Sequence, residues 1–140
     1  MFKKILSVMI LLAVVFICGQ NNFAQAKDVY MGNDENGNKV YLMTESIDKK
    51  QTSYSKIWKM WSYECYVQFK SVHPEYGPLF FGYTITWGPE EEPGYKDKNG
   101  NWQGVDESGE VNPRFNSDPD VYRARILNRA YKYLCDNGYV

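Results

Sequence analysis

Acidic side chains between Gly88 and Glu110 are the residues in this sequence best suited to chemistry. Three glutamates are adjacent and further acids follow at intervals, namely Glu90, Glu91, Glu92, Asp97, Asp106, Glu107 and Glu110. Glycoside hydrolysis uses paired carboxylates at a separation that a rigid groove fixes. Adjacent glutamates in a segment rich in Gly and Pro are more often simply solvated. A secreted hydrolase using carboxylates of this loop is therefore an alternative hypothesis rather than the main one.

The pattern Asp-x-Asn-Gly-Asn occurs twice, at 34–38 and 97–101, and raises the question of calcium. A calcium loop places glycine sixth and glutamate twelfth, whereas both copies have glycine fourth, Lys39 or Trp102 sixth, and Glu45 or Ser108 twelfth. Asn-Gly is the preferred pair of a type I′ hairpin turn, so the repeat predicts one turn used twice. Calcium binding stays an alternative, and we expect no metal or cofactor.

No residue has a sequence-visible catalytic partner. His73 is the only histidine, and it lies in a Pro-containing turn without acids at the spacing of a base or a ligand set. No Ser or Cys has such a base, and there is no Gly-rich phosphate loop. We therefore predict no catalytic residue.

Aromatic side chains offer a route to binding. Tyr66 and Phe80 lie on the outward registers of two predicted strands, and Trp102 lies in a loop. Exposed, coplanar rings can stack on sugar rings or anchor a protein partner. These three are our candidate ligand-binding residues.

Strands must position these residues. Asp28 to Met31 and Lys39 to Ile47 predict a hairpin across Asn36-Gly37, followed by a polar loop from Asp48 to Lys56. Alternation of apolar and polar residues then predicts an antiparallel pair, Tyr63 to Val72 and Leu79 to Trp87. Gly88 to Phe115 predicts one or two short, irregular hairpins.

The C-terminal segment, Ser117 to Gly138, predicts a helix with Ser117 as its N-cap and Gly138 as its stop. Its predicted core face consists of Val121, Ala124, Leu127, Tyr131, Leu134 and Cys135. The fold class is therefore α+β: a small antiparallel sheet of about four to six strands, covered on one face by a C-terminal amphipathic helix.

The N-terminal hairpin resembles a known group. The residues Asp28-Val29-Tyr30-Met31-Gly32 and Val40-Tyr41-Leu42-Met43-Thr44-Glu45 are similar to those of uncharacterised small exported proteins of anaerobic bacteria. Because that group has no assigned activity, the resemblance implies export and a small β-rich domain, and no functional residues.

Residues 1–26 predict a secretory signal peptide. Two lysines precede an apolar run from Ile5 to Gly19, and Ala24-Gln25-Ala26 supplies a cleavage pattern. As a membrane anchor the run is short, because a span needs about 20 apolar residues. We expect cleavage after Ala26, one α+β domain over 27–140, and a secreted or periplasmic location.

The predicted mature chain keeps 14 basic and 17 acidic side chains, because cleavage removes two lysines and no acid. Its scattered basic residues do not indicate a nucleic-acid partner. Its two cysteines, Cys65 and Cys135, predict a disulfide, since export permits one and only one pairing exists.

Taken together, these features favour a non-enzymatic binding module for a protein or a cell-envelope component. The alternatives are the hydrolase described above, or a calcium- or glycan-binding module.

Overall fold

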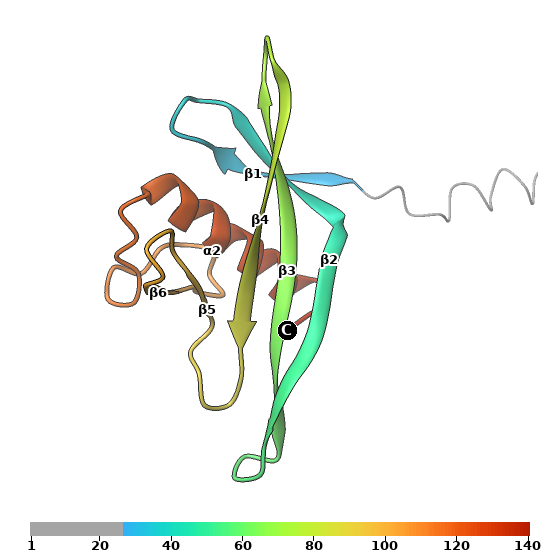
Figure 1. The fold of residues 1–140 in the computed structure, drawn as a ribbon, viewed down its shortest axis with the longest axis vertical. Coiled ribbons are helices and arrows are strands. Elements are labelled where there is room, and N and C mark those ends of the chain that lie inside the picture. The colour runs from blue at the N-terminus through green and yellow to red at the C-terminus, as the bar shows by residue number, and fades with distance from the viewer. Residues whose placement is uncertain (1–26) are drawn as a thin grey trace, which may run out of the picture.

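The computed structural model describes residues 27–140, and the predicted signal peptide lies outside the described residues. Within residues 27–140, six strands form one antiparallel sheet in chain order, and a single helix packs against it (Figure 1). The predicted α+β class is confirmed. The elements are β1 (Asp28–Asn33), β2 (Lys39–Ser55), β3 (Met60–His73), β4 (Gly77–Trp87), β5 (Gly94–Lys96), β6 (Trp102–Gly104) and α2 (Val121–Asp136).

Strand β2 is much longer than predicted. The expected loop from Asp48 to Lys56 is wrong, because β2 continues to Ser55 and pairs with β3 from Asp48↔Tyr66 to Ser55↔Met60. Two register irregularities, after Met43 and after Gln51, interrupt this pairing. The sequence of this half of β2 is polar, as in a loop, because its side chains are mostly exposed. Its backbone is nevertheless in a strand, because it pairs with β3.

The core lies between the sheet and α2. Alternate residues of β3 and β4 point inward, among them Val67, Phe69 and Ile85, and they meet Leu127 and Leu134 of the helix. Trp87 and Tyr131 join the two layers with ring centroids 6.3 Å apart. Because side chains alternate across a strand, the other register of β3 and β4 faces away from the helix.

Helix α2 begins three residues later than predicted. Asp120, not Ser117, is the N-cap, and its carboxylate accepts hydrogen bonds from the backbone N–H groups of Tyr122 and Arg123. The Ser117 N–H instead donates a hydrogen bond to the side-chain oxygen of Gln103. The predicted stop is confirmed: Gly138 has φ of 77° and the Tyr139 N–H bonds the Leu134 carbonyl.

The buried face of α2 is broader than the predicted one. Ala124, Leu127, Tyr131 and Leu134 are buried as predicted. Ile126 and Ala130 are buried as well, whereas Val121 is 56% exposed. Val121 is the first residue of α2 and lies beyond the edge of the core. It is therefore exposed, although its helical spacing matches that of the buried residues.

Candidate functional site: a groove on the helix-free face

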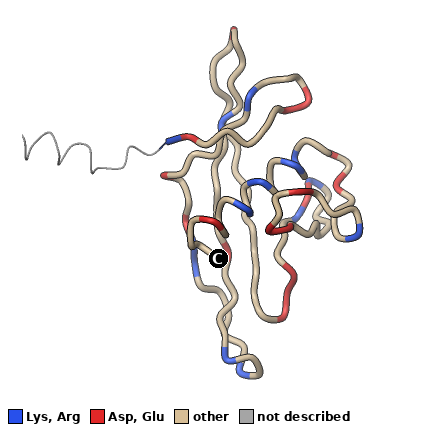
Figure 2. The backbone as a smooth tube through the Cα atoms, turned by 180° about the vertical axis from the view of Figure 1, so that it is seen from behind, with Lys and Arg blue, Asp and Glu red and all other residues tan. Residues whose placement is uncertain are grey.

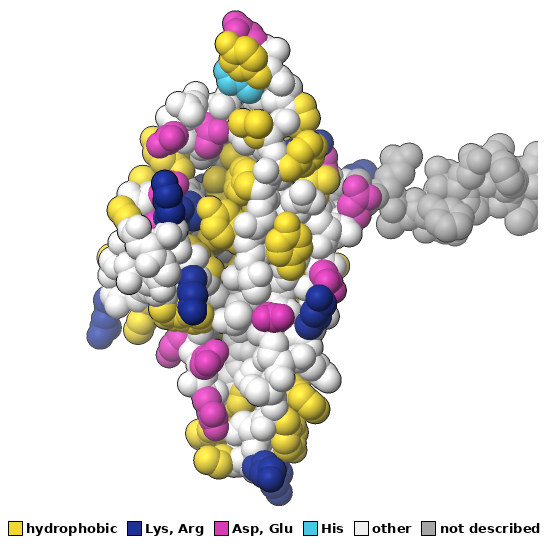
Figure 3. All heavy atoms as spheres, in the orientation of Figure 1, with side chains coloured by type: hydrophobic (Ala, Val, Ile, Leu, Met, Phe, Trp, Pro, Cys, Tyr) yellow, Lys and Arg dark blue, Asp and Glu magenta, His cyan; other side chains and the backbone are white. Residues whose placement is uncertain are grey.

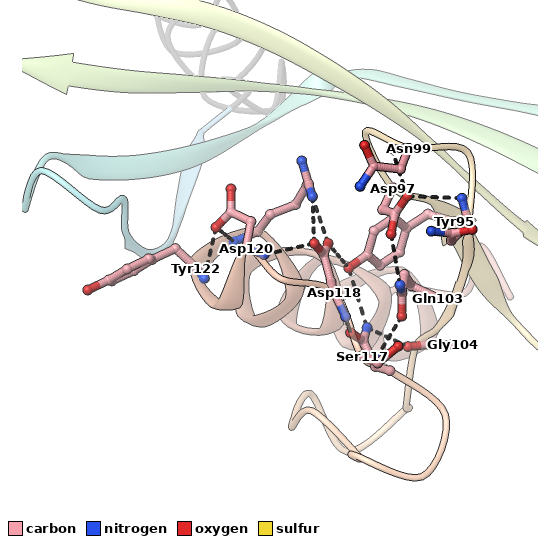
Figure 4. A network of polar contacts seen from close by, with 12 residues as sticks. Tyr95, Asp97, Asn99, Gln103, Gly104, Ser117, Asp118, Asp120 and Tyr122 are labelled. Atoms are coloured by element: carbon pink, nitrogen blue, oxygen red, sulfur yellow. Dashed lines mark hydrogen bonds and ion pairs between the residues drawn. The ribbon is translucent and has the colours of Figure 1, made fainter.

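A buried polar network fixes the β5–β6 hairpin to the start of α2 (Figure 4). The Tyr95 hydroxyl of β5 donates to the Asp118 carboxylate at 2.7 Å. Arg123 donates to both oxygens of the same carboxylate, at 2.7 and 2.5 Å. The Asp118 side chain is fully buried, so this two-pronged ion pair is shielded from solvent.

Gln103 of β6 carries the second half of the network. Its amide donates to Asp97 at 2.9 Å and accepts from the Ser117 N–H at 2.7 Å. Asn116 donates to the Gly104 carbonyl at 2.9 Å. Two strands of only three residues are thus held by side chains rather than by a long ladder.

The pKa shifts in this network keep Asp118 and Tyr95 each in one protonation state. Burial raises the pKa of the Asp118 carboxyl, but hydrogen bonds from Arg123, Tyr95 and the Asp120 N–H outweigh it and leave the pKa below its usual value. Burial raises the pKa of Tyr95 well above its ordinary range. Asp118 is therefore an anion and Tyr95 a neutral donor, which suits a structural role.

Two glycines on the helix-free face make room for aromatic rings. A Cβ built on Gly94 would lie 2.6 Å from the Trp102 ring, and one on Gly82 would lie 2.1 Å from the Tyr66 hydroxyl oxygen. Trp102 and Tyr66 are 42% and 43% exposed. Each ring therefore lies flat over a glycine and keeps part of its surface in solvent.

A groove of about 750 Å³ runs between β4 and the β5–β6 hairpin on this face. Its lining is mainly apolar and consists of Gly82, Tyr83, Thr84, Thr86, Glu91, Glu92, Tyr95, Lys96 and Trp102. Apolar walls with a few polar groups, at this volume, are typical of small-ligand sites.

One hydroxyl in the groove has no partner. The Thr86 side-chain oxygen is buried and makes no hydrogen bond with any residue in 27–140. Thr86 lines the groove and pairs with Gly94 across the β4–β5 junction. A buried polar atom without a partner is rare and marks a place where a ligand or water could bond.

The structure brings two of the three predicted binding residues to this groove. Trp102 lines it, and Tyr66 borders it through Gly82. Phe80 is exposed on the same face but pairs with Lys70 nearer the β3–β4 turn, outside the lining. The sequence analysis missed Thr84 and Thr86, although their polar register on the predicted strand could have indicated them.

The loop carboxylates are distributed over several places. Glu91 and Glu92 line the groove, while Glu90 accepts from the Ser55 hydroxyl at 2.8 Å. Asp106 accepts from the Ser108 N–H at 2.8 Å and so caps its own turn. Of the acidic residues between Gly88 and Glu110, only Glu91 and Glu92 therefore line the groove.

The two Asp-x-Asn-Gly-Asn copies form the same turn, as predicted, but its predicted type is wrong. Asp34 and Asp97 each accept from the N–H groups two and four residues later, at 2.9 Å. Only the glycines, Gly37 and Gly100, have positive φ, whereas a type I′ turn needs two such residues. The carboxylates act as caps of the backbone, and residues 27–140 contain no group of three or more potential metal ligands among His, Cys, Asp and Glu.

His73 also serves a turn. Its Nδ1 accepts from the N–H groups of Glu75 and Tyr76, at 3.0 and 3.2 Å. Its ring lies 4.5 Å from the Tyr76 ring.

A second cavity, of about 730 Å³, lies beside α2 and includes Arg125, Arg129 and Lys132. Arg129 donates to the Met31 carbonyl at 2.8 Å, and Lys132 pairs with Asp136 at 2.6 Å. Arg125 lies 5.9 Å from the centroid of the Tyr122 ring, so all three of these cations are already engaged.

Cys65 and Cys135 are thiols in this structure, and both lie at the same core cluster. Burial raises the pKa of Cys65 to about 11 and also raises that of Cys135. Their oxidative pairing stays a prediction.

No helix within residues 27–140 has the length and hydropathy to cross a membrane. Comparison with known proteins found no matching family, curated protein or solved structure. The resemblance of the N-terminal hairpin to small exported proteins therefore also stays a prediction, and the function is argued from the groove.

Proposed function

We propose that this protein is an exported, non-enzymatic binding module that takes a glycan component of the cell envelope into the groove beside Trp102. The observation that carries this proposal is the unpartnered Thr86 hydroxyl in the lining of an apolar groove that also contains the exposed Trp102 ring. A sugar offers an apolar ring face and hydroxyls at its edge, so it can use the indole and the threonine together.

The shape of the groove favours a glycan over a flat protein epitope. Its volume of about 750 Å³ is concave space for a small ligand. The polar groups around it include Thr84, Lys96 and the pair Glu91 and Glu92, which can accept from or donate to sugar hydroxyls and substituents. A protein partner would instead bury a broad patch of about 800 Å² per side.

Calorimetric titration of soluble envelope glycan fragments tests the proposal, with thermal shift as a second readout because a ligand of the native state raises the midpoint. Trp102→Ala should weaken binding at least about tenfold through loss of the stacking surface. Thr86→Val, which keeps the shape and removes the hydroxyl, should weaken it about fivefold. Phe80→Ala is the matched control, since Phe80 is exposed on the same face outside the groove. Binding that ignores Trp102→Ala would contradict the proposal.

A hydrolase is the second candidate, because Glu91 and Glu92 both line the groove. A hydrolase would release reducing ends from the same glycans, and Glu91→Gln or Glu92→Gln would stop the release while binding persisted. A binding module would release no reducing ends at any concentration of the protein.

A further inference from the structure

The turn between β2 and β3 forms one end of the molecule along its longest axis (Figure 1). Lys56–Lys59 make the turn, and Lys59 has a positive φ of 53°. Just behind the turn, Tyr54 and Trp61 pair across the strands with ring centroids 5.3 Å apart. This pair braces the tip, so the turn projects from two paired strands.

The tip exposes large apolar side chains that no other element of residues 27–140 covers. The exposed fractions are 82% for Ile57, 59% for Trp58, 57% for Met60, 48% for Tyr54 and 41% for Trp61. These residues are consecutive or nearly so, and Figure 3 shows hydrophobic side chains gathered at this end of the molecule. A contiguous exposed apolar patch marks an interaction surface.

The tip is also positively charged, in contrast to the rest of the domain. Residues 49–63 contain four lysines and no acid, while the rest of 27–140 has 10 basic and 17 acidic side chains. Figure 2 shows lysines and no acids at the turn. At the base of the turn, the Ser55 hydroxyl donates to the Glu90 carboxylate at 2.8 Å.

Two of the four lysines are already engaged and two are not. Lys49 lies 4.3 Å from the centroid of the Tyr63 ring, and Lys50 pairs with Asp48 at 3.5 Å. Lys56 and Lys59, within the turn itself, form no ion pair with any residue in 27–140. These two unpaired lysines therefore alternate along the turn with the exposed apolar residues Ile57, Trp58 and Met60.

We propose that this tip inserts into the interface of a lipid bilayer that carries anionic lipid. Tryptophan and tyrosine prefer the headgroup region, where the ring is buried and its polar edge stays hydrated. Lys56 and Lys59 are placed to meet lipid phosphates as the apolar residues enter. A second copy of the chain fits the charge poorly, since two tips would bring four unpaired lysines together. The tip lies at the end of the β2–β3 hairpin, apart from the groove residues, so both surfaces can act together.

Sedimentation with vesicles of phosphatidylcholine, with or without phosphatidylglycerol, tests this proposal. The wild-type chain should bind the anionic vesicles, less strongly as salt rises. Ile57→Ser/Trp58→Ser should lower the partition coefficient at least about tenfold. Lys56→Gln/Lys59→Gln should lower it about fivefold per lysine, and only on anionic vesicles. All samples share one N-terminus, so that residues 1–26, if present, contribute equally.

Tyr76→Ser is the matched control, because Tyr76 is 82% exposed at the β3–β4 turn, beside Glu75. It should bind vesicles as the wild type does, and so should Trp102→Ala in the groove, which separates this proposal from the glycan site. If the apolar double variant fails to fold by circular dichroism, the lysine variant decides. Absence of vesicle binding, binding that ignores both tip variants, or a dimer that dissociates on tip substitution would overturn the proposal.

Discussion

Asp118 is the residue on which the placement of the groove most depends. Its carboxylate joins Tyr95 of β5 to Arg123 of α2, and its side chain is fully buried. A buried charge is tolerated only where it is paired, so loss of the charge leaves Arg123 without its partner. Because Tyr95 lines the groove, the network couples the stability of the domain to the geometry of the groove.

We expect Asp118→Asn to lower the free energy of unfolding by about 3 kcal/mol, because it breaks a buried ion pair by changing one partner. Urea denaturation measures this, with Asp136→Asn as the control. Asp136 pairs with Lys132 at the surface, where such a pair contributes only about 0 to 1 kcal/mol. Equal effects of the two substitutions would contradict the buried network.

The same carboxyl predicts an acid dependence. The pKa of Asp118 is lowered in the folded state, so its stabilisation is complete above the unfolded pKa of about 3.9 and is lost as pH falls through the folded value. The wild type should therefore lose stability below about pH 4 more steeply than Asp118→Asn. Asp34, Asp97 and Asp106 also have lowered pKa values and contribute in both proteins.

At Cys65 and Cys135 we predict a disulfide in protein recovered from outside the cytoplasm. In the chain-entropy model, closing a loop of about 70 residues stabilises by about 4 kcal/mol, less any native strain. Intact mass before and after reduction should differ by two hydrogens, and reductant should lower the melting midpoint of the wild type. A mass that reduction leaves unchanged would show two thiols, as in the present structure.

At the scale of elements, short segments depend on their neighbours. Strands β5 and β6 have three residues each. Hydrogen bonds from Asn116 and Ser117, in the segment before α2, to Tyr95, Gln103 and Gly104 hold them in place. Strand β2 extends through a polar stretch because β3 pairs with it. Neither feature follows from local propensity, which ranks these residues as loop formers.

The start of α2 gives a direct test at this scale. Asp120→Ala should destabilise the domain by about 1 kcal/mol, because two N–H groups of the first turn lose their acceptor. Ser117→Ala should change stability by less than about 0.5 kcal/mol, since Ser117 is exposed and precedes the cap. Thermal unfolding of both variants decides between the observed and the predicted cap, and the reverse order would favour Ser117.

For the whole molecule, we predict that the exported protein begins at Lys27. The charged start, the apolar run and Ala24-Gln25-Ala26 together indicate cleavage after Ala26. Intact mass of protein collected outside the cytoplasm measures this directly. A mass that includes residues 1–26 would show that the segment is retained. The vesicle experiments would then compare proteins that all carry residues 1–26.

Two surfaces of the domain are proposed for binding, and they differ in chemistry. The groove offers an indole, hydroxyls and carboxylates, whereas the β2–β3 tip offers apolar side chains with two free lysines. A domain attached to a bilayer by its tip would hold the groove near the membrane surface.

The sequence by itself determined the class of the fold. Period-two alternation in β3 and β4 and helical spacing in α2 indicate which faces are buried, and those patterns are local. It also indicated Tyr66 and Trp102 as exposed aromatics, and the repeated turn at Asp34 and Asp97. Each of these follows from residues that lie within a few positions of one another.

Only the tertiary structure decided where the site lies. Thr86 and Gly94 become neighbours because β4 and β5 pair, and Trp102 covers Gly94 because β6 folds back beside it. The extension of β2 and the cap at Asp120 likewise depend on β3 and on Gln103, which are distant in sequence. Pairing between distant segments is set by packing and hydrogen bonding across the whole domain, and no local pattern encodes it.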